Sequence, residues 1–148
     1  MLARTIIAIT FLGAGVVGVL AQSDVIKARK ELMRGNNDGA GVIFGMARGR
    51  VPFDAAKADA AFAQFVETGQ KFGSLFPDDS KPKPPLGDYS ASMKIWENKA
   101  DFNAKIAAFG KMAAENRPKV KTLDGLKTTL KPLGQSCDNC HELYRVKN

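Results

Sequence analysis

Apolar residues recur at the spacing of an α-helix in four stretches of the chain, and no stretch alternates in the way that a half-buried β-strand requires. The first helix is expected over residues 24–48. The second is expected to begin at an N-cap, Asp54, and to end near Gly73, and the third to begin at Asn98. The fourth is expected over residues 123–144. Four amphipathic helices in about 125 residues predict an all-α, antiparallel four-helix bundle.

Proline and glycine interrupt this pattern at three places. Four prolines follow the second helix, so a long irregular loop is expected up to Trp96. Pro132 lies inside the fourth helix and predicts a kink, or a helix that restarts near Gly134. The first stretch holds four glycines, which favour either a break at residues 35–37 or a close approach of its backbone to a bulky neighbour.

The first 21 residues have the layout of a secretory signal peptide. Arg4 precedes an apolar run that ends at Leu20, and a cleavage point is expected after Ala21. The alternative is a retained membrane anchor, although the run has about 15 residues where a bilayer requires roughly 20. We therefore expect a signal peptide over residues 1–21 and a mature domain over residues 22–148, exported to the periplasm without membrane insertion.

The chain is basic, with a formal net charge of +7. A basic surface can bind nucleic acid, but export argues against that partner. Such a surface also steers a protein toward partners of opposite charge. We therefore expect acidic protein partners and no nucleic acid.

Both cysteines and the only histidine lie close to the C-terminus, in the sequence Cys137-Asp138-Asn139-Cys140-His141. Helical residues three apart share a side, so both thiols are expected on one side of the fourth helix, next to the imidazole. Cys-x-x-Cys-His is the attachment motif of c-type haem. In such a site both thiols form thioethers with the haem, and the histidine binds the iron as the proximal ligand.

Three other interpretations of this motif exist. A thioredoxin-like redox pair requires a strand before the motif and a helix after it, whereas here the motif ends an all-helical chain. A zinc site commonly takes four Cys or His ligands, and this chain has three such residues in total. A structural disulfide accounts for Cys137 and Cys140 but leaves His141 without a role.

Beyond this motif, the chain resembles cytochrome c′ and its low-spin relatives of the cytochrome c-556 type. The resemblance rests on "CDNCHELYR" over residues 137–145, "RKELM" over 29–33, "LFPDDS" over 75–80 and "KIWENKADF" over 94–102. These motifs are spread over nearly the whole mature chain. The segment "YSASMKIW", residues 89–96, looks closest to the low-spin members.

The resemblance implies one covalent haem c between the helices at one end of the bundle, near the C-terminal helix, with His141 as proximal ligand. The first helix then covers the distal side at Met33, which bonds iron in the low-spin type and only covers it in the high-spin type. Arg29 lies one turn before Met33 and is placed to pair with a haem propionate, unless it is a solvated surface residue. Arg145 lies one turn after His141 and either tunes the imidazole or complements the helix C-terminus.

The function that we expect is single-electron transfer to redox partner proteins by a low-spin haem with His141 and Met33 as ligands, and not enzymatic catalysis. The alternative is a high-spin, five-coordinate cytochrome c′ that binds nitric oxide or carbon monoxide. A haem peroxidase is less favoured because the only histidine is already assigned to iron. Since many relatives pair through their first two helices, the resemblance also implies a homodimer.

Overall fold

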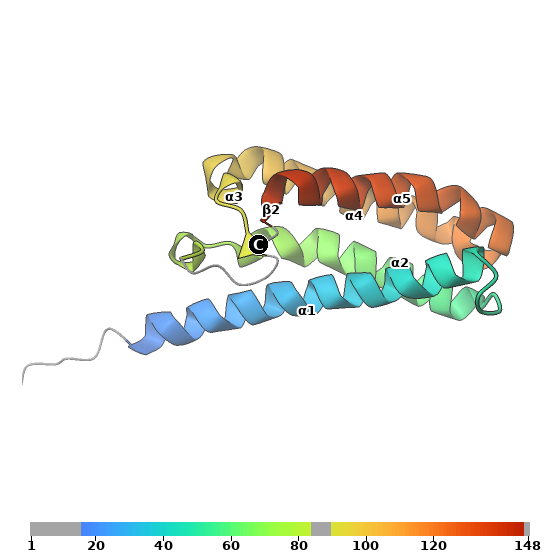
Figure 1. Cartoon of the computed structure of the whole chain (residues 1–148), viewed down its shortest axis with the longest axis horizontal. Helices are drawn as coiled ribbons and strands as arrows, with labels where there is room; N and C mark the ends of the chain where they lie inside the picture. Colours follow the sequence, from blue (N-terminus) through green and yellow to red (C-terminus); the bar gives the residue numbers. More distant parts are fainter. Residues whose placement is uncertain (1–15, 84–89, 147–148) are drawn as a thin grey trace, which may run out of the picture.

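Four long helices form the body of the molecule. The structure is a computed structural model that describes residues 16–83 and 90–146. The long helices are α1 (Val16–Ala47), α2 (Ala55–Lys71), α4 (Lys99–Asn116) and α5 (Leu123–Tyr144). Figure 1 shows successive helices running in opposite directions. Because α2 contacts both α1 and α4, and α5 contacts both α4 and α1, the helices close into a ring. The predicted antiparallel four-helix bundle is confirmed.

The segment between α2 and α4 is more ordered than the predicted loop. Its described part contains two 3₁₀ helices, one short α-helix and one short strand: η1 (Phe72–Leu75), η2 (Asp78–Ser80), α3 (Lys94–Glu97) and β1 (Ser90–Ala91). β1 pairs antiparallel with β2 (Arg145–Val146), which follows α5 directly. No strand was predicted, because two-residue strands are too short to show alternation. A third 3₁₀ helix, η3 (Arg117–Lys121), links α4 to α5.

Side-chain caps begin three of the helices. Asp54 accepts a hydrogen bond from the backbone nitrogen of Lys57 at 3.1 Å, and Asn98 accepts one from that of Asp101 at 3.4 Å. Both predicted N-caps are confirmed. α5 is one continuous helix across Pro132, so the predicted restart near Gly134 is wrong, whereas the alternative of a kink stays a prediction. Pro132 is exposed, and water can therefore solvate the carbonyl that its missing N–H leaves unpaired.

α1 is continuous, so the alternative of a break at residues 35–37 is also wrong. The helix begins at Val16, upstream of the predicted start. Residues 1–15 of the predicted signal peptide lie outside the described residues. None of the helices in the described part of the chain combines the length and apolar character needed to cross a bilayer.

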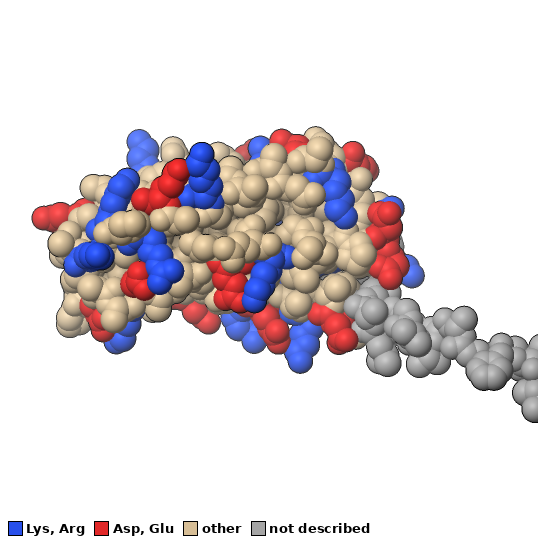
Figure 2. All heavy atoms as spheres, turned by 180° about the vertical axis from the view of Figure 1, so that it is seen from behind, with Lys and Arg blue, Asp and Glu red and all other residues tan. Residues whose placement is uncertain are grey.

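Charged side chains of both signs are interspersed over the face of the bundle in Figure 2. Several of them form exposed pairs one helical turn apart, such as Lys27 with Glu31 on α1 and Lys71 with Glu67 on α2. Exposed pairs of this kind contribute about 0.2–1 kcal/mol each. The stability of the bundle therefore depends on its interior.

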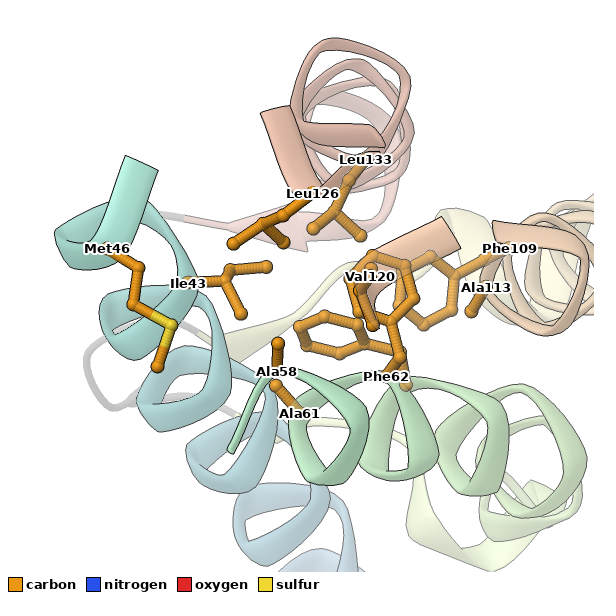
Figure 3. Close-up of a cluster of buried hydrophobic side chains, with 11 residues drawn as sticks. Ile43, Met46, Ala58, Ala61, Phe62, Phe109, Ala113, Val120, Leu126 and Leu133 are labelled. Carbon is orange, nitrogen blue, oxygen red and sulfur yellow. The ribbon is translucent and has the colours of Figure 1, made fainter. Parts of the chain in front are cut away.

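The interior consists of two clusters of buried side chains. The first core cluster draws on all four long helices and η3 (Figure 3); it contains Ile43, Met46, Ala58, Ala61, Phe62, Phe65, Phe109, Ala113, Val120, Leu126 and Leu133. The aromatic cluster contains Phe72, Phe76, Ile95, Phe102, Ile106 and Tyr144. The phenylalanines at positions 65, 72, 102 and 109 are all buried.

α2 and α4 cross closely at a pair of glycines. A Cβ atom on Gly69 would lie 2.3 Å from the Cα atom of Gly110, closer than any real Cβ contact. Only glycine at both positions allows the two backbones to meet. In α1, a Cβ on Gly39 would lie 3.2 Å from the Cβ of Ala61, whereas one on Gly41 would meet nothing within 4 Å. The predicted close approach of α1 to a neighbour therefore holds for Gly39 but not for Gly41.

We expect Phe102→Ala to lower the free energy of unfolding by about 3–5 kcal/mol. Phe102 is 1% exposed, and its ring centroid lies 4.9 Å from that of Phe76 and 5.1 Å from that of Tyr144. Denaturant unfolding of the holoprotein measures the change. Val42→Ala, at an exposed position of α1, is the control and should stay within about 0.5 kcal/mol. An equally small change for Phe102→Ala would contradict the packing described here.

Two glycine substitutions should change stability in opposite directions. Gly69→Ala places a methyl group against the backbone of α4 and should destabilise the fold by about 1–3 kcal/mol. Gly41→Ala meets open space and should stabilise α1 by about 0.5–1 kcal/mol. Thermal unfolding of both variants tests the pair. Equal effects from the two substitutions would contradict the close crossing.

Candidate haem-binding site

The predicted attachment motif lies at the C-terminal end of α5. The helix begins at Thr122, whose hydroxyl accepts a hydrogen bond from the backbone nitrogen of Gly125 at 3.1 Å, and it runs unbroken to Tyr144. The unbroken helix keeps Cys137 and Cys140 one turn apart on the same side. Both cysteines and the adjacent histidine are half-buried.

The two cysteines meet different parts of the interior. Cys137 packs against the first core cluster, whereas Cys140 packs against the aromatic cluster. The motif therefore lies where the two clusters adjoin along α5.

Met33 of α1, a helix that contacts α5, is the predicted residue on the distal side. Its side chain is half-buried and packs against the aromatic cluster, as does that of Cys140. Leu32, Leu75, Ala91 and Trp96 complete the partly buried shell of this cluster. The fold thus brings together two of the predicted site residues that are far apart in the sequence.

The two thiols do not have the electrostatics of a redox pair. Burial raises the pKa of Cys137, and the nearby Asp138 carboxylate raises it further. Burial also raises the pKa of Cys140, and the nearby Cys137 raises it further. Redox-active cysteines instead have lowered pKa values, and these two thiols are free. The thioredoxin-like and disulfide interpretations are therefore not supported.

The surroundings of His141 favour its neutral form. Burial lowers the pKa of the imidazole, the positive charge of Arg145 lowers it further, and Asp138 acts in the opposite direction. Neutral imidazole is the form of histidine that binds a metal. The predicted tuning of a haem-bound imidazole by Arg145 stays a prediction.

Taken together, these side chains fit haem c. Two thiols lie one turn apart on the inner side of a helix, a neutral imidazole follows at once, and a thioether packs against the same cluster from the facing helix. Imidazole and thioether are the axial ligands of many cytochromes. Within residues 16–83 and 90–146, no three His, Cys, Asp or Glu side chains gather as a metal site of their own, so the zinc interpretation finds no ligand set there.

Arg29 is buried and is not the solvated surface residue of the alternative. It is 8% exposed, and its guanidinium carbon lies 3.9 Å from the ring centroid of Phe76. Nε donates a hydrogen bond to the carbonyl oxygen of Leu75 at 2.6 Å, and Nη2 donates one to the hydroxyl of Ser80. Burial lowers the pKa of Arg29 to about 10. The residue therefore ties α1 to the segment that follows α2.

Arg145 is exposed and ends α5. Its backbone nitrogen donates a hydrogen bond to the carbonyl oxygen of His141, which satisfies a carbonyl at the helix end. The residue then enters β2, where it pairs with Ala91 of β1. Arg145 thus lies at the helix C-terminus, and its predicted role toward the haem imidazole stays a prediction.

Sequence reasoning missed two residues near this site. Asn36 lies one turn after Met33, and its amide nitrogen is 4.0 Å from the methionine sulfur. The spacing of three residues on one helix is a signal that could have identified Asn36. Asp101 accepts a hydrogen bond from the hydroxyl of Tyr144, and burial together with this bond raises the pKa of Tyr144 to about 12. No local pattern indicates that second contact, because it joins α4 to α5.

A four-helix bundle that carries Cys-x-x-Cys-His at the end of its last helix is a bundle-type c-cytochrome. The family model described as "Cytochrome C'" matches residues 24–145. Cytochrome c-556 of Rhodopseudomonas palustris is 39% identical over 145 residues, which cover 97% of both chains. Cytochrome c′ of the same organism is 32% identical over 143 residues, which cover 97% of this chain and 94% of that one.

A solved structure agrees with these sequence comparisons. The NMR-validated structural model for oxidized R. palustris cytochrome c556 matches with a TM-score of 0.76 and 38% identity, covering 85% of this chain and 98% of that one. The chain belongs to the cytochrome c′ family. It is an electron-carrying c-type cytochrome with one covalent haem c.

Haem should stay attached to this protein in acidified acetone, because thioethers survive a solvent that extracts non-covalent haem. The protein must first mature in a host competent for c-type cytochromes. Cys137→Ala and Cys140→Ala should each leave the haem loosely held or absent, while Ser136→Ala, next to the motif, should leave it attached. Free extraction of haem from the unmodified protein would contradict attachment at this motif.

Proposed function

We propose that the protein transfers single electrons through a low-spin haem held by Cys137, Cys140 and His141, with the sulfur of Met33 as the second axial ligand. The observation that carries this proposal is the packing of Met33 and Cys140 against one aromatic cluster from facing helices. The greater identity to a cytochrome c-556 than to a cytochrome c′ also supports it.

The haem supplies an iron that accepts and returns one electron. The residues around it determine how readily this happens. A thioether ligand favours ferrous iron relative to a second histidine, which raises the reduction potential. The lowered pKa of His141 favours the neutral imidazole needed for ligation. Ligands on two packed helices need little movement between oxidation states, which suits electron transfer.

We further propose that Arg29 meets a propionate of the haem. Its cation is buried at the edge of the aromatic cluster, and only burial is identified as shifting its pKa. A buried cation is costly unless it is paired, and a propionate would supply the opposite charge. Arg145, whose charge lowers the pKa of His141, would tune the proximal side.

The cellular setting is proposed on the sequence alone. The predicted signal peptide over residues 1–21 supports export and cleavage, and covalent haem fits a periplasmic carrier. Pairing of two copies through α1 and α2 stays a prediction, which sedimentation of the mature holoprotein tests.

The role of Met33 separates an electron carrier from a gas-binding protein. If its sulfur bonds iron, the ferric protein shows a weak sulfur-to-iron band at the red edge of the spectrum, and the ferrous protein takes up carbon monoxide slowly or not at all. Met33→Ala should abolish the band and open iron to carbon monoxide while the haem stays attached. Met112→Ala is the matched control, because Met112 is also half-buried but packs against the first core cluster.

The opposite result would favour the other class of cytochrome. Wild-type protein that is already high-spin and binds carbon monoxide readily would refute ligation by Met33. The residue would then only cover the distal side, and binding of nitric oxide or carbon monoxide would become the better proposal.

We propose acidic redox proteins as partners, because the sequence carries a formal charge of +7. Opposite charges accelerate the encounter of two proteins. Their attraction extends over a screening length of about 30 Å at 0.01 M salt, but of only about 8 Å at 0.15 M. The second-order rate constant with an acidic electron acceptor should therefore fall as salt rises. Stopped-flow measurement at both salt concentrations tests this, and an unchanged or rising rate constant would rule out such steering.

A further inference from the structure

A chain of three hydrogen bonds ends on the sulfur of Met33. Asn36, one turn further along α1, is half-buried and points its amide nitrogen at this sulfur from 4.0 Å. The amide oxygen of Asn36 accepts a hydrogen bond from the hydroxyl of Thr68 on α2 at 2.8 Å. Asn36 thus connects the proposed iron ligand to the neighbouring helix.

Thr68 determines which way the Asn36 amide faces. Thr68 is fully buried, with 0% exposure, and its hydroxyl oxygen accepts a hydrogen bond from Nε2 of Gln64 at 3.3 Å. Because that oxygen already accepts one bond, its own proton is directed at the oxygen of Asn36. The NH₂ group of Asn36 must then face the other way, toward Met33.

Gln64, at the other end of this series of hydrogen bonds, packs against α1. A Cβ atom on Gly35 would lie 2.8 Å from the Cδ atom of Gln64, so any side chain at this position would displace the end of the glutamine. This accounts for a second glycine of α1. It also means that the position of Gln64 depends on the packing of α1 against α2.

We propose that Asn36 is a positioning residue for Met33, which it orients toward the iron and whose sulfur it makes a weaker electron donor. This inference rests on the proposed ligation by Met33. A thioether sulfur has two lone pairs; the amide of Asn36 engages one of them and the other is left for the metal. Hydrogen bonds from outside the ligand set are an established means of tuning metal ligands.

The direction and size of the effect follow from elementary chemistry. A hydrogen bond withdraws electron density from sulfur, which disfavours ferric iron more than ferrous iron and raises the potential. A neutral hydrogen bond corresponds to about a two- to tenfold factor in an equilibrium constant. For a one-electron couple at 59 mV per decade, that factor is about 18–59 mV.

The test compares substitutions in the holoprotein by two measurements, the reduction potential and the energy of the sulfur-to-iron band. Asn36→Ala should lower the potential by about 18–59 mV and shift the band, with haem still attached. Thr68→Val keeps the side-chain shape but removes the hydroxyl. It should therefore change the potential and the band energy in the same direction as Asn36→Ala, but by a smaller amount. Thr68→Ser restores the hydroxyl and should return both to the wild-type values.

Asn37→Ala is the matched control, since Asn37 is the exposed neighbour of Asn36 on the same helix. If Asn36→Ala yields no folded holoprotein, the comparison of Thr68→Val with Thr68→Ser tests the role of Asn36. Suppose that the wild-type protein shows the sulfur-to-iron band, and that Asn36→Ala and Thr68→Val change neither the band nor the reduction potential. That result overturns the role of Asn36 and leaves ligation by Met33 intact. A wild-type protein that lacks the band overturns both proposals, so the two failures are distinguishable.

Discussion

The packing of α1 across the end of α5 is the constraint on which the rest of this structure depends. The antiparallel order of the four helices brings Met33 and Cys140 to one aromatic cluster, although they lie at opposite ends of the mature sequence. An unbroken α5 carries Cys137, Cys140 and His141 with a fixed spacing. One helix thus presents the whole attachment motif, and the facing helix presents the proposed second ligand.

Two contacts fix the elements around that meeting point. Gly69 and Gly110 let α2 and α4 approach so closely that no side chain separates them. Arg29 binds the segment after α2 through the carbonyl of Leu75 and the hydroxyl of Ser80. The first contact is apolar and the second buries a cation, so they respond differently to substitution. Together these contacts fix the helices around the site, while α1 and α5 carry the proposed haem ligands.

Much of this arrangement is local and could be predicted from sequence. Asp54 is a capping residue followed by an apolar period, and Cys-x-x-Cys-His is a spacing with a specific chemical meaning. The continuity of α5 through Pro132 was missed because it depends on solvation of an exposed carbonyl. The crossing at Gly69, the burial of Arg29 and the hydrogen bond between Asn36 and Thr68 depend on contacts between different segments, which no single-sequence pattern records.

Proton NMR of the reduced protein, labelled with ¹³C at the methionine methyl groups, tests the central claim most directly. A methyl group bound through its sulfur to a diamagnetic haem iron lies over the porphyrin plane, where the ring current shifts its resonance far upfield. We expect one such resonance, assigned to Met33 and not to Met46, Met93 or Met112, the other methionines of the mature sequence. A Met33 methyl resonance at an ordinary position would contradict ligation, and with it the proposal of a low-spin electron carrier.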